Sequence, residues 1–363
     1  MMDFPFPRSN IEKLQTYKPN FGKSKTNTLI RLSANESALG ASLSAIETLK
    51  SFSNDLHRYP PQVSNDLTSA ISKRYSLNKK KIILGNGSDE LISILAQTFL
   101  NPDDEAIYTQ FGFLQFPQAI SIVGAKGIVA SDEYYTASVD NILSNINKNT
   151  KIIFLANPNN PTGTFISRDE VIRLHEAIPP NILLVYDAAY AEFVVNKNYI
   201  DGSELVDKYE NVIMLRTFSK LHGLASLRLG WGYASENIID NLMKVRGPFS
   251  VNTAAIMAGV AALEDLEFQK KSVEHNIKWM SWFEKELDSL NLDFQPSIAN
   301  FLLINFPDKY KYTARNAEMF LASKGILVRG MGVYGLSDHL RVSIGNEEEN
   351  LKFIEQLKLF LEN

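Results

Sequence analysis

Residues 211–230 read N-V-I-M-L-R-T-F-S-K-L-H-G-L-A-S-L-R-L-G. The four apolar residues that follow Asn211 are typical of a short strand buried on both faces. Ser219 and Lys220 come soon after this strand, and Arg228 stands eight residues beyond the lysine. Open α/β sheets bind their ligands beyond the carboxyl ends of the strands, so these polar residues are expected at a ligand site.

The side chains of this stretch suit a phosphorylated carbonyl compound. Lysine is the residue that forms a Schiff base with a carbonyl or with pyridoxal phosphate. The Ser219 hydroxyl and the Arg228 guanidinium are both suited to one phosphate group, because arginine binds phosphate oxygens in pairs. The plain alternative is that Lys220 is a solvated lysine at a strand end, and so short a motif does not exclude it by itself.

Composition limits the class of protein. The chain has 363 residues, which exceeds the usual single core, so one large and one smaller domain are expected. Hydrophobic residues make up 45% and charged residues 21%, as in ordinary soluble globular proteins. The net charge of −4 gives no electrostatic sign of a nucleic-acid or membrane partner.

Several residue types and patterns are absent from the sequence. There is no cysteine, which excludes disulfides and thiolate metal sites, and the five histidines show no metal-ligand spacing. The sequence shows no signal-peptide pattern and no apolar run near the length of about 20 residues that spans a membrane. These limits favour a cytoplasmic enzyme without a metal.

The order of patterns predicts three parts: an arm (1–30), a large domain (31–250) and a small C-terminal domain (251–363). The arm has sparse apolar anchors, which are more typical of packing on a partner or a neighbouring domain than of a free tail. Two helical patterns flank H-R-Y-P at residues 57–60.

In the large domain, short apolar runs alternate with helical patterns. The expected strands are residues 82–84, 106–108, 152–156, 182–186 and 212–215. This alternation is typical of βαβ units and a mainly parallel sheet. Ser167 with Glu170 predicts a capping box at one of the helices.

The C-terminal part follows a different pattern. The pattern of residues 254–287 predicts a long helical stretch. An α+β segment follows it, with expected strands at 301–304, 326–328 and 340–344. Helical patterns cover residues 317–321 and the chain from Glu347 onward.

Three further segments carry candidate chemistry. G-N-G-S-D-E at residues 85–90 joins a strand to a helix and suits a phosphate, but a plain tight turn is an equal alternative. A dinucleotide fingerprint is excluded because Glu90 replaces the third glycine. Asn160 lies in a loop stiffened by two prolines. Asp187 ends an apolar run, and a carboxylate in such a place is stable only if it meets a cation or a hydrogen-bond donor, such as a protonated pyridine nitrogen. The alternative is an aspartate that caps the turn after the strand.

Five motifs in order resemble those of the fold-type I pyridoxal-phosphate aminotransferases. They are G-N-G-S-D-E (85–90), N-P-N-N-P-T-G (157–163), Y-D-A-A-Y-A-E-F (186–193), R-T-F-S-K-L-H-G-L-A-S-L-R-L-G (216–230) and L-R-V-S-I-G (340–345). L-Q-T-Y-K-P at residues 14–19 and H-R-Y-P make the chain similar to the histidinol-phosphate aminotransferases within that class. The resemblance covers nearly the whole chain.

This resemblance implies a fold and a set of roles. The fold would be a three-layer αβα large domain with a mainly parallel sheet, plus a smaller α+β C-terminal domain. Lys220 would bind the aldehyde of pyridoxal phosphate, Asp187 would keep the pyridine nitrogen protonated, and Asn160 and Tyr190 would bond the phenolic oxygen O3′. Phe113 would stack on the ring.

The resemblance also implies phosphate and substrate ligands. The cofactor phosphate would be held by Ser88, Asp89, Ser219 and Arg228, with Tyr59 from the other subunit of a homodimer. Arg341 would hold the substrate carboxylate, with Asn160 beside it. Arg329 lies twelve residues before Arg341, on what reads as a neighbouring strand. Arg329 and Tyr17 of the other subunit would help to bind a phosphorylated substrate.

The implied reaction exchanges amino groups between histidinol phosphate and 2-oxoglutarate, in histidine biosynthesis. Two departures leave the substrate more open than the cofactor: N-E-S-A-L-G at residues 35–40 lacks the usual proline, and Phe113 replaces a tyrosine. An aromatic amino acid aminotransferase and a phosphothreonine decarboxylase stay open as alternatives. A non-catalytic cofactor-binding module is disfavoured, because Lys220, Asp187 and Arg341 are all present.

Overall fold

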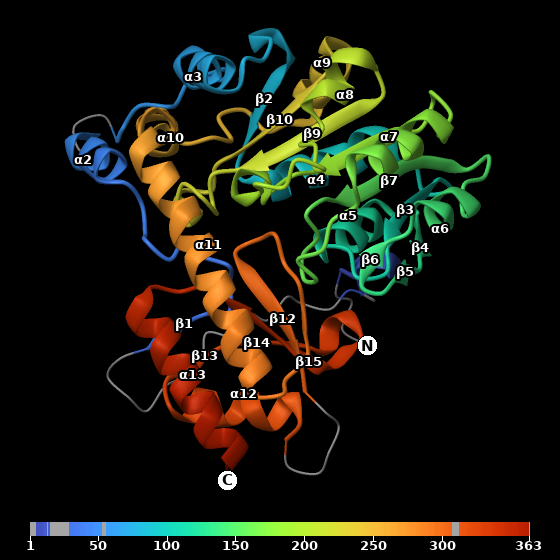
Figure 1. Ribbon diagram of the computed structural model, residues 1–363. Coiled ribbons are helices and arrows are strands. Elements are labelled where there is room, and N and C mark those ends of the chain that lie inside the picture. Colours follow the sequence, from blue (N-terminus) through green and yellow to red (C-terminus); the bar gives the residue numbers. More distant parts are fainter. Residues whose placement is uncertain (1–4, 13, 15–28, 53–55, 307–311, 363) are drawn as a thin grey trace.

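The computed structural model describes residues 5–12, 14, 29–52, 56–306 and 312–362. Two units lie one above the other in Figure 1, and helix α11 (Leu266–Ser289) runs from the larger unit along the smaller one. The larger unit is a seven-stranded sheet with helices on both faces, and the smaller unit is a four-stranded sheet with helices.

The large sheet is mainly parallel. Its strand order is β2-β10-β9-β8-β7-β3-β4, and β10 alone among these strands runs antiparallel to its neighbours. The strands are β2 (Ile82–Gly85), β3 (Glu105–Thr109), β4 (Lys126–Ala130), β7 (Thr150–Ala156), β8 (Leu183–Asp187), β9 (Val212–Thr217) and β10 (Gly230–Ala234).

Strand β9 shows why the sheet needs helices on both faces. Val212 and Met214 belong to one hydrophobic cluster, while Ile213 and Leu215 belong to the cluster on the opposite face. Side chains of a strand alternate between faces, so a run of apolar residues is stable only where both faces are covered. The first cluster includes residues of α3 (Asn65–Tyr75), α6 (Val139–Ser144), α7 (Arg168–Ala177), α8 (Ser203–Lys208) and α10 (Thr253–Glu264), and the second those of α4 (Ser88–Phe99), α5 (Gln115–Val123) and α9 (Glu236–Val245).

The smaller unit is built on an antiparallel sheet of order β11-β12-β15-β14. Its strands are β11 (Phe294–Gln295), β12 (Phe301–Asn305), β14 (Arg329–Met331) and β15 (Leu336–Ser343), and its other helices are α12 (Ala314–Ser323) and α13 (Glu347–Glu362). The short strand β1 (Ile30–Arg31) pairs in parallel with β13 (Ile326–Leu327), so this segment lies in the smaller unit.

The remaining elements are short. They are α1 (Ser9–Glu12), α2 (Leu43–Ser51), β5 (Asp132–Glu133) and β6 (Thr136–Ala137), together with the 3-10 helices Lys79–Lys81, Ala191–Phe193, Ala225–Leu227 and Gly332–Tyr334. The described start of the predicted arm lies against its own chain, since Arg8 Nη2 donates to the Ile122 carbonyl at 2.6 Å. Tyr17 and most of the arm lie outside the described residues.

The predicted fold class is confirmed, with corrections at particular elements. Strands β4 and β10 are not among the expected strands, because Lys126–Ala130 is largely exposed and β10 contains Gly230 and Gly232, which read as chain breakers. The single helical pattern over 254–287 is two helices, α10 and α11, which meet at Asp265.

The predicted capping box is formed only in part. Ser167 accepts a hydrogen bond from the Glu170 N–H, but the Glu170 carboxylate pairs with Arg173 instead of turning back to the cap.

The predicted division at residues 30 and 250 stays a prediction. In the structure Ile30 and Arg31 pair with β13 of the smaller unit. Helix α10 contributes Ala255, Ile256 and Ala258 to the core of the larger unit, although it follows residue 250.

Candidate active site

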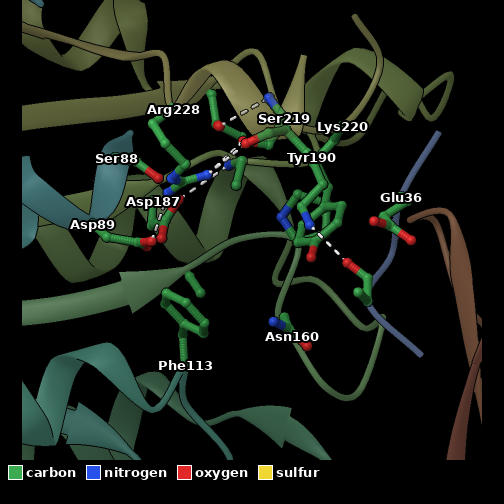
Figure 2. A pocket seen from close by; sticks show the side chains of 16 residues that line it. Glu36, Ser88, Asp89, Phe113, Asn160, Asp187, Tyr190, Ser219, Lys220 and Arg228 are labelled. Carbon is green, nitrogen blue, oxygen red and sulfur yellow. Dashed lines mark hydrogen bonds and ion pairs between the residues drawn. The ribbon is translucent and has the colours of Figure 1, made fainter. Parts of the chain in front are cut away.

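A cavity of about 820 Å³, including the part open to solvent, lies at the carboxyl ends of β7, β8 and β9 (Figure 2). Asn160 follows β7, Asp187 and Tyr190 come at the end of β8, and Lys220 follows β9. The fold therefore brings these residues together at the edge of the sheet where the sequence predicts a ligand site. The walls are formed by Ala34, Glu36, Ser88, Asp89, Phe113, Ala156, Pro158, Asn160, Asp187, Ala189, Tyr190, Thr217, Ser219, Lys220, Ala225 and Arg228.

One end of the cavity is an anion cradle. Arg228 Nη1 lies 3.4 Å from Ser219 Oγ, and Arg228 Nη2 lies 3.0 Å from Asp89 Oδ2. Ser88 is the first residue of α4, a twelve-residue helix whose N-terminal N–H groups suit an anion. All four of these residues line the cavity.

Two glycines permit the close packing around this cradle. A Cβ at Gly87, whose φ is +80°, would lie 2.5 Å from Arg228 Nη2. A Cβ at Gly230 would lie 2.3 Å from the Ser88 nitrogen. Since real Cβ atoms do not approach so closely, side chains at either position would push apart the groups that form the cradle.

Lys220 enters the cavity with its ammonium near the backbone of a distant segment. Its Nζ donates to the Ala34 carbonyl at 3.2 Å and lies 5.7 Å from the centre of the Tyr190 ring. Burial, followed by the nearby Arg341 guanidinium, lowers the pKa of Lys220 to about 8. A lysine with a lowered pKa is neutral more often near neutral pH, so it can act as a nucleophile or a base.

Asp187 is a buried carboxyl group on the cavity wall, with 4% of its surface exposed. Its Oδ1 accepts a hydrogen bond from the Ala189 N–H at 3.1 Å. Burial raises the pKa of Asp187 to about 7, although this N–H opposes the shift. A cationic donor facing this carboxylate would stabilise it, and a protonated pyridine nitrogen supplies that kind of group.

Tyr190 is held by a residue from another part of the chain. Asn35 Nδ2 donates to Tyr190 Oη at 2.9 Å, and both residues are buried. Burial raises the pKa of Tyr190 to about 12, so the phenol keeps its proton across the physiological range.

A second cavity continues from the first toward the smaller unit. Arg329, Tyr334 and Arg341 are among its lining residues, together with Lys220 and Tyr190 of the first cavity. Arg341 donates to Asn160 Oδ1, and its Nη2 donates to the Ser33 carbonyl at 2.8 Å. Because Asn160 Oδ1 accepts from Arg341, the amide nitrogen is the atom that this side chain can offer as a donor.

The two arginines predicted for the substrate are neighbours on adjacent strands. Arg329 of β14 is paired in register with Arg341 of β15. The predicted neighbouring strand is therefore confirmed, and both side chains reach the same cavity.

Tyr59, in contrast, is not among the lining residues of either cavity of its own chain. It is 82% exposed, and its ring stacks on Phe249 with centroids 4.9 Å apart. Phe113 lines both cavities and packs edge-on against Phe116, with centroids 5.9 Å apart.

Sequence reasoning missed the segment Ser33–Glu36 as part of the site. Ser33 and Ala34 contribute carbonyl oxygens, Asn35 contributes an amide and Glu36 lines the cavity. The only sequence signal for this segment is N-E-S-A-L-G at residues 35–40. By local pattern it indicates a turn that lacks the proline usual in the family, and it does not point to a cavity wall.

Comparison with known proteins gives the same class as the site. Residues 27–357 match the family described as Aminotransferase class I and II. The histidinol-phosphate aminotransferase of Maricaulis maris is 44% identical over 356 residues, which cover 98% of each chain. That of Paramagnetospirillum magneticum is 43% identical over 361 residues, which cover 99% of each chain.

A solved structure shows the same fold. Histidinol-phosphate aminotransferase from Sinorhizobium meliloti, in complex with pyridoxal-5'-phosphate, matches with a TM-score of 0.92 over 99% of both chains, at 24% identity. In the described residues, no helix is both long and apolar enough to cross a membrane.

The fold and the cavity define a fold-type I aminotransferase that depends on pyridoxal phosphate. The residues fit this cofactor, since the anion cradle suits its phosphate, Asp187 suits its ring nitrogen and Lys220 suits its aldehyde. Within this class, the chain belongs to the family of the histidinol-phosphate aminotransferases.

Proposed function

We propose that this protein transfers an amino group from L-histidinol phosphate to 2-oxoglutarate, giving imidazole-acetol phosphate and L-glutamate, and so acts in histidine biosynthesis. The observation that carries the proposal is the 41–44% identity to six histidinol-phosphate aminotransferases over 98–99% of the chain. Fold alone would not carry it, because one fold serves many activities.

When bound, pyridoxal phosphate supplies an aldehyde for amine exchange and a ring that takes up the electron pair released at the substrate Cα. The chain supplies the rest. Ser88, Ser219 and Arg228, which line one end of the cavity, hold the phosphate. Asp187 holds the ring nitrogen protonated, and Lys220 moves a proton between the substrate Cα and C4′ of the cofactor.

Three more residues position the ring. Tyr190 and the amide nitrogen of Asn160, which line the cavity, would bond the phenolic oxygen, and Phe113 would cover the ring. Asp89 contributes at the phosphate end by holding Arg228 at 3.0 Å. A phenylalanine at position 113 gives up the hydroxyl that a tyrosine would offer.

The substrate specificity is assigned to two arginines. Glutamate has an α-carboxylate, whereas histidinol phosphate has a phosphorylated hydroxymethyl group at the same position. Arg341 can bind either oxyanion, but a dianionic phosphate favours a second guanidinium. Arg329, in register with Arg341, is the residue that we assign to this role, with Tyr17 of the other subunit as a further ligand.

The test is Arg329→Ala with the two half-reactions measured separately. Loss of a charge-assisted contact to phosphate corresponds to about 1.5–3 kcal/mol, so kcat/KM for histidinol phosphate should fall roughly ten- to a hundredfold. The half-reaction with glutamate should change far less. Arg315→Ala, an exposed arginine of α12, is the matched control and should change neither.

Two results would contradict this substrate. Equal losses in both half-reactions would remove the assigned role of Arg329. A parent enzyme that prefers phenylalanine or tyrosine as donor would favour an aromatic amino acid aminotransferase, and carbon dioxide release from phosphothreonine would favour a decarboxylase.

The active unit is proposed to be a homodimer in which Tyr59 reaches the cofactor phosphate of the partner. Its support is the position of Tyr59, which is 82% exposed beside Phe249 and lines neither cavity of its own chain. Tyr59→Ala should weaken cofactor binding, and the protein should sediment as a dimer. A monomer that keeps full activity on dilution would overturn this arrangement. The cytoplasm is the proposed location, which cell fractionation checks.

A further inference from the structure

Asn35 connects the two units of the protein at the edge of the cavity. It lies between β1 of the smaller unit and α2, is 1% exposed, and adopts a left-handed backbone conformation with φ of 55°. Its backbone N–H donates to Ser343 Oγ at 2.8 Å, and its amide nitrogen donates to Tyr190 Oη at 2.9 Å. Ser343 Oγ in turn lies 3.2 Å from Asn35 Oδ1.

These contacts set the direction of the hydrogen bonds. Ser343 is buried, and its Oγ already accepts the Asn35 N–H, so its own proton needs an acceptor. Asn35 Oδ1 is that acceptor, which directs Asn35 Nδ2 to Tyr190. The reverse amide orientation would turn two donors toward Ser343 and leave its proton, among the described contacts, without an acceptor.

The Tyr190 hydroxyl is oriented as a consequence. A phenol that accepts a hydrogen bond from an amide directs its single proton elsewhere. Tyr190 lines the cavity, so this proton is available on the side where the cofactor binds. We name Tyr190, Asn35 and Ser343 the Asn35 relay.

The relay starts on the strand that carries the substrate arginine. Ser343 and Arg341 both belong to β15. Next to Asn35 in the chain, the Ala34 carbonyl accepts from Lys220, and the Ser33 carbonyl accepts from Arg341. The side-chain amide of Asn300, just before β12, also donates to the Asn35 carbonyl at 3.2 Å, so the backbone of this segment is held as well.

We propose that Asn35 and Ser343 are positioning residues that hold the Tyr190 hydroxyl as a hydrogen-bond donor to the phenolic oxygen of the cofactor. This role rests on the placement of that oxygen beside Tyr190 proposed above. It adds two residues that do not touch the cofactor, and it connects the electronic state of the cofactor to the position of β15.

The effect is measurable without substrate. In the protein loaded with cofactor, the phenolic oxygen would share a proton with the nitrogen of Lys220. A hydrogen-bond donor to this oxygen would stabilise its negative charge and so favour loss of that proton. The absorption of the loaded protein then changes at a lower pH. Removing the donor should move the midpoint of this spectral change upward by roughly one pH unit, as expected for one hydrogen bond to a charged group.

The experiment titrates the absorption of the loaded protein in a set of variants. Tyr190→Phe removes the hydroxyl donor altogether, so it should show the full upward shift of the midpoint. Asn35→Asp replaces the amide donor by a carboxylate that accepts the Tyr190 proton, so it should shift the midpoint in the same direction. In the Tyr190→Phe background, Asn35→Asp should add little further shift, because the proton that it diverts is already gone.

Further variants separate positioning from general damage. Ser343→Ala should give part of the shift, and Ser343→Thr, which keeps the hydroxyl, should restore the parent midpoint. Ser272→Ala, at a buried serine outside the relay, should leave the midpoint unchanged.

Two outcomes would overturn the proposal. One is a midpoint that Asn35→Asp and Ser343→Ala leave in place. The other is an Asn35→Asp shift of equal size with and without the Tyr190 hydroxyl, which would show a direct effect of charge. If Asn35→Asp does not fold, Ser343→Ala decides by itself. Because no substrate is used, these results are independent of whether histidinol phosphate is the substrate.

Discussion

Two cations close together on the chain have opposite environments. Arg216 lies in β9, 3% exposed, with Glu192 Oε1 at 3.1 Å and Asp201 Oδ2 at 3.0 Å. Lys220 follows the same strand, and its nitrogen contacts the uncharged Ala34 carbonyl at 3.2 Å. The first cation is balanced by carboxylates within the core, and the second faces the cavity.

The pKa values of Arg216 and Lys220 differ in the same way as their environments. Although burial lowers the pKa of Arg216, the groups around it, with Glu192 the strongest, more than offset burial and hold that pKa above its usual value. For Lys220, burial and Arg341 act in the same direction and lower the pKa to about 8. The buried cation that stabilises the fold, Arg216, is therefore paired with carboxylates. The cation at the reactive site, Lys220, has a lowered pKa, as expected for a catalytic group.

The largest expected effect comes from removing the reactive cation. Lys220→Ala should lower transamination by at least roughly 10²–10⁴-fold, since the proton transfer at Cα loses its base. Borohydride treatment of the loaded parent should attach the cofactor to Lys220, as read by peptide mapping. Attachment at a different lysine would falsify the role given to Lys220.

Asp187 is the next test, because it is the buried carboxylate that the chain leaves to the cofactor. Asp187→Ala should keep some cofactor but lose about 10²-fold in transamination, as expected when a preorganised electrostatic partner is removed. Steady-state rates at saturating cofactor measure this. Activity within a few-fold of the parent would show that the carboxylate is not needed at the ring nitrogen.

The structural cation is tested by stability. Glu192→Gln removes one of the two carboxylates paired with Arg216, in a buried ion pair whose side chains are 4% and 6% exposed, and should cost up to about 3–5 kcal/mol of unfolding free energy. Urea denaturation of the loaded protein measures it. Glu170→Gln, in the exposed pair with Arg173, is the control and should leave the midpoint unchanged. Equal effects of both changes would remove the contrast drawn between buried and exposed pairs.

The smallest effect is a pH dependence in the protein stripped of cofactor. The Asp187 carboxyl titrates near 3.8 when unfolded and about 7 when folded. Between these pH values the folded state binds one more proton than the unfolded state, so the stability contributed by Asp187 falls as pH rises. Asp187→Asn, which cannot ionise, should therefore gain on the order of 2 kcal/mol over the parent between about pH 5 and pH 8.

Unfolding at several pH values, followed by fluorescence, measures this difference. In the loaded protein the trend should shrink, because a protonated ring nitrogen stabilises the carboxylate. A constant difference between Asp187→Asn and the parent across this pH range would mean that Asp187 is already ionised in the folded protein.

Local patterns predicted most of the sheet but missed β4 at one edge and β10, which lies between β2 and β9. The run that includes Met214 was predicted correctly because a strand buried on both faces is apolar at every position. Strand β10 was missed because Gly230 and Gly232 weaken a strand signal. Gly230 is required by the close approach of Ser88, a contact between positions far apart in the sequence that no local pattern reveals.

The sequence by itself determined the fold class, the strand-end position of Lys220 and Asp187, and the place of Arg329 and Arg341 on neighbouring strands. These follow from local patterns and from motifs in a fixed order. Only the tertiary structure placed Ser33, Ala34 and Asn35 against the residues of the cavity, because they reach it through the packing of the smaller unit on the larger one. The shifted acidities of Lys220 and Asp187 were decided there too, since burial and the distance to other charges exist only in the folded chain.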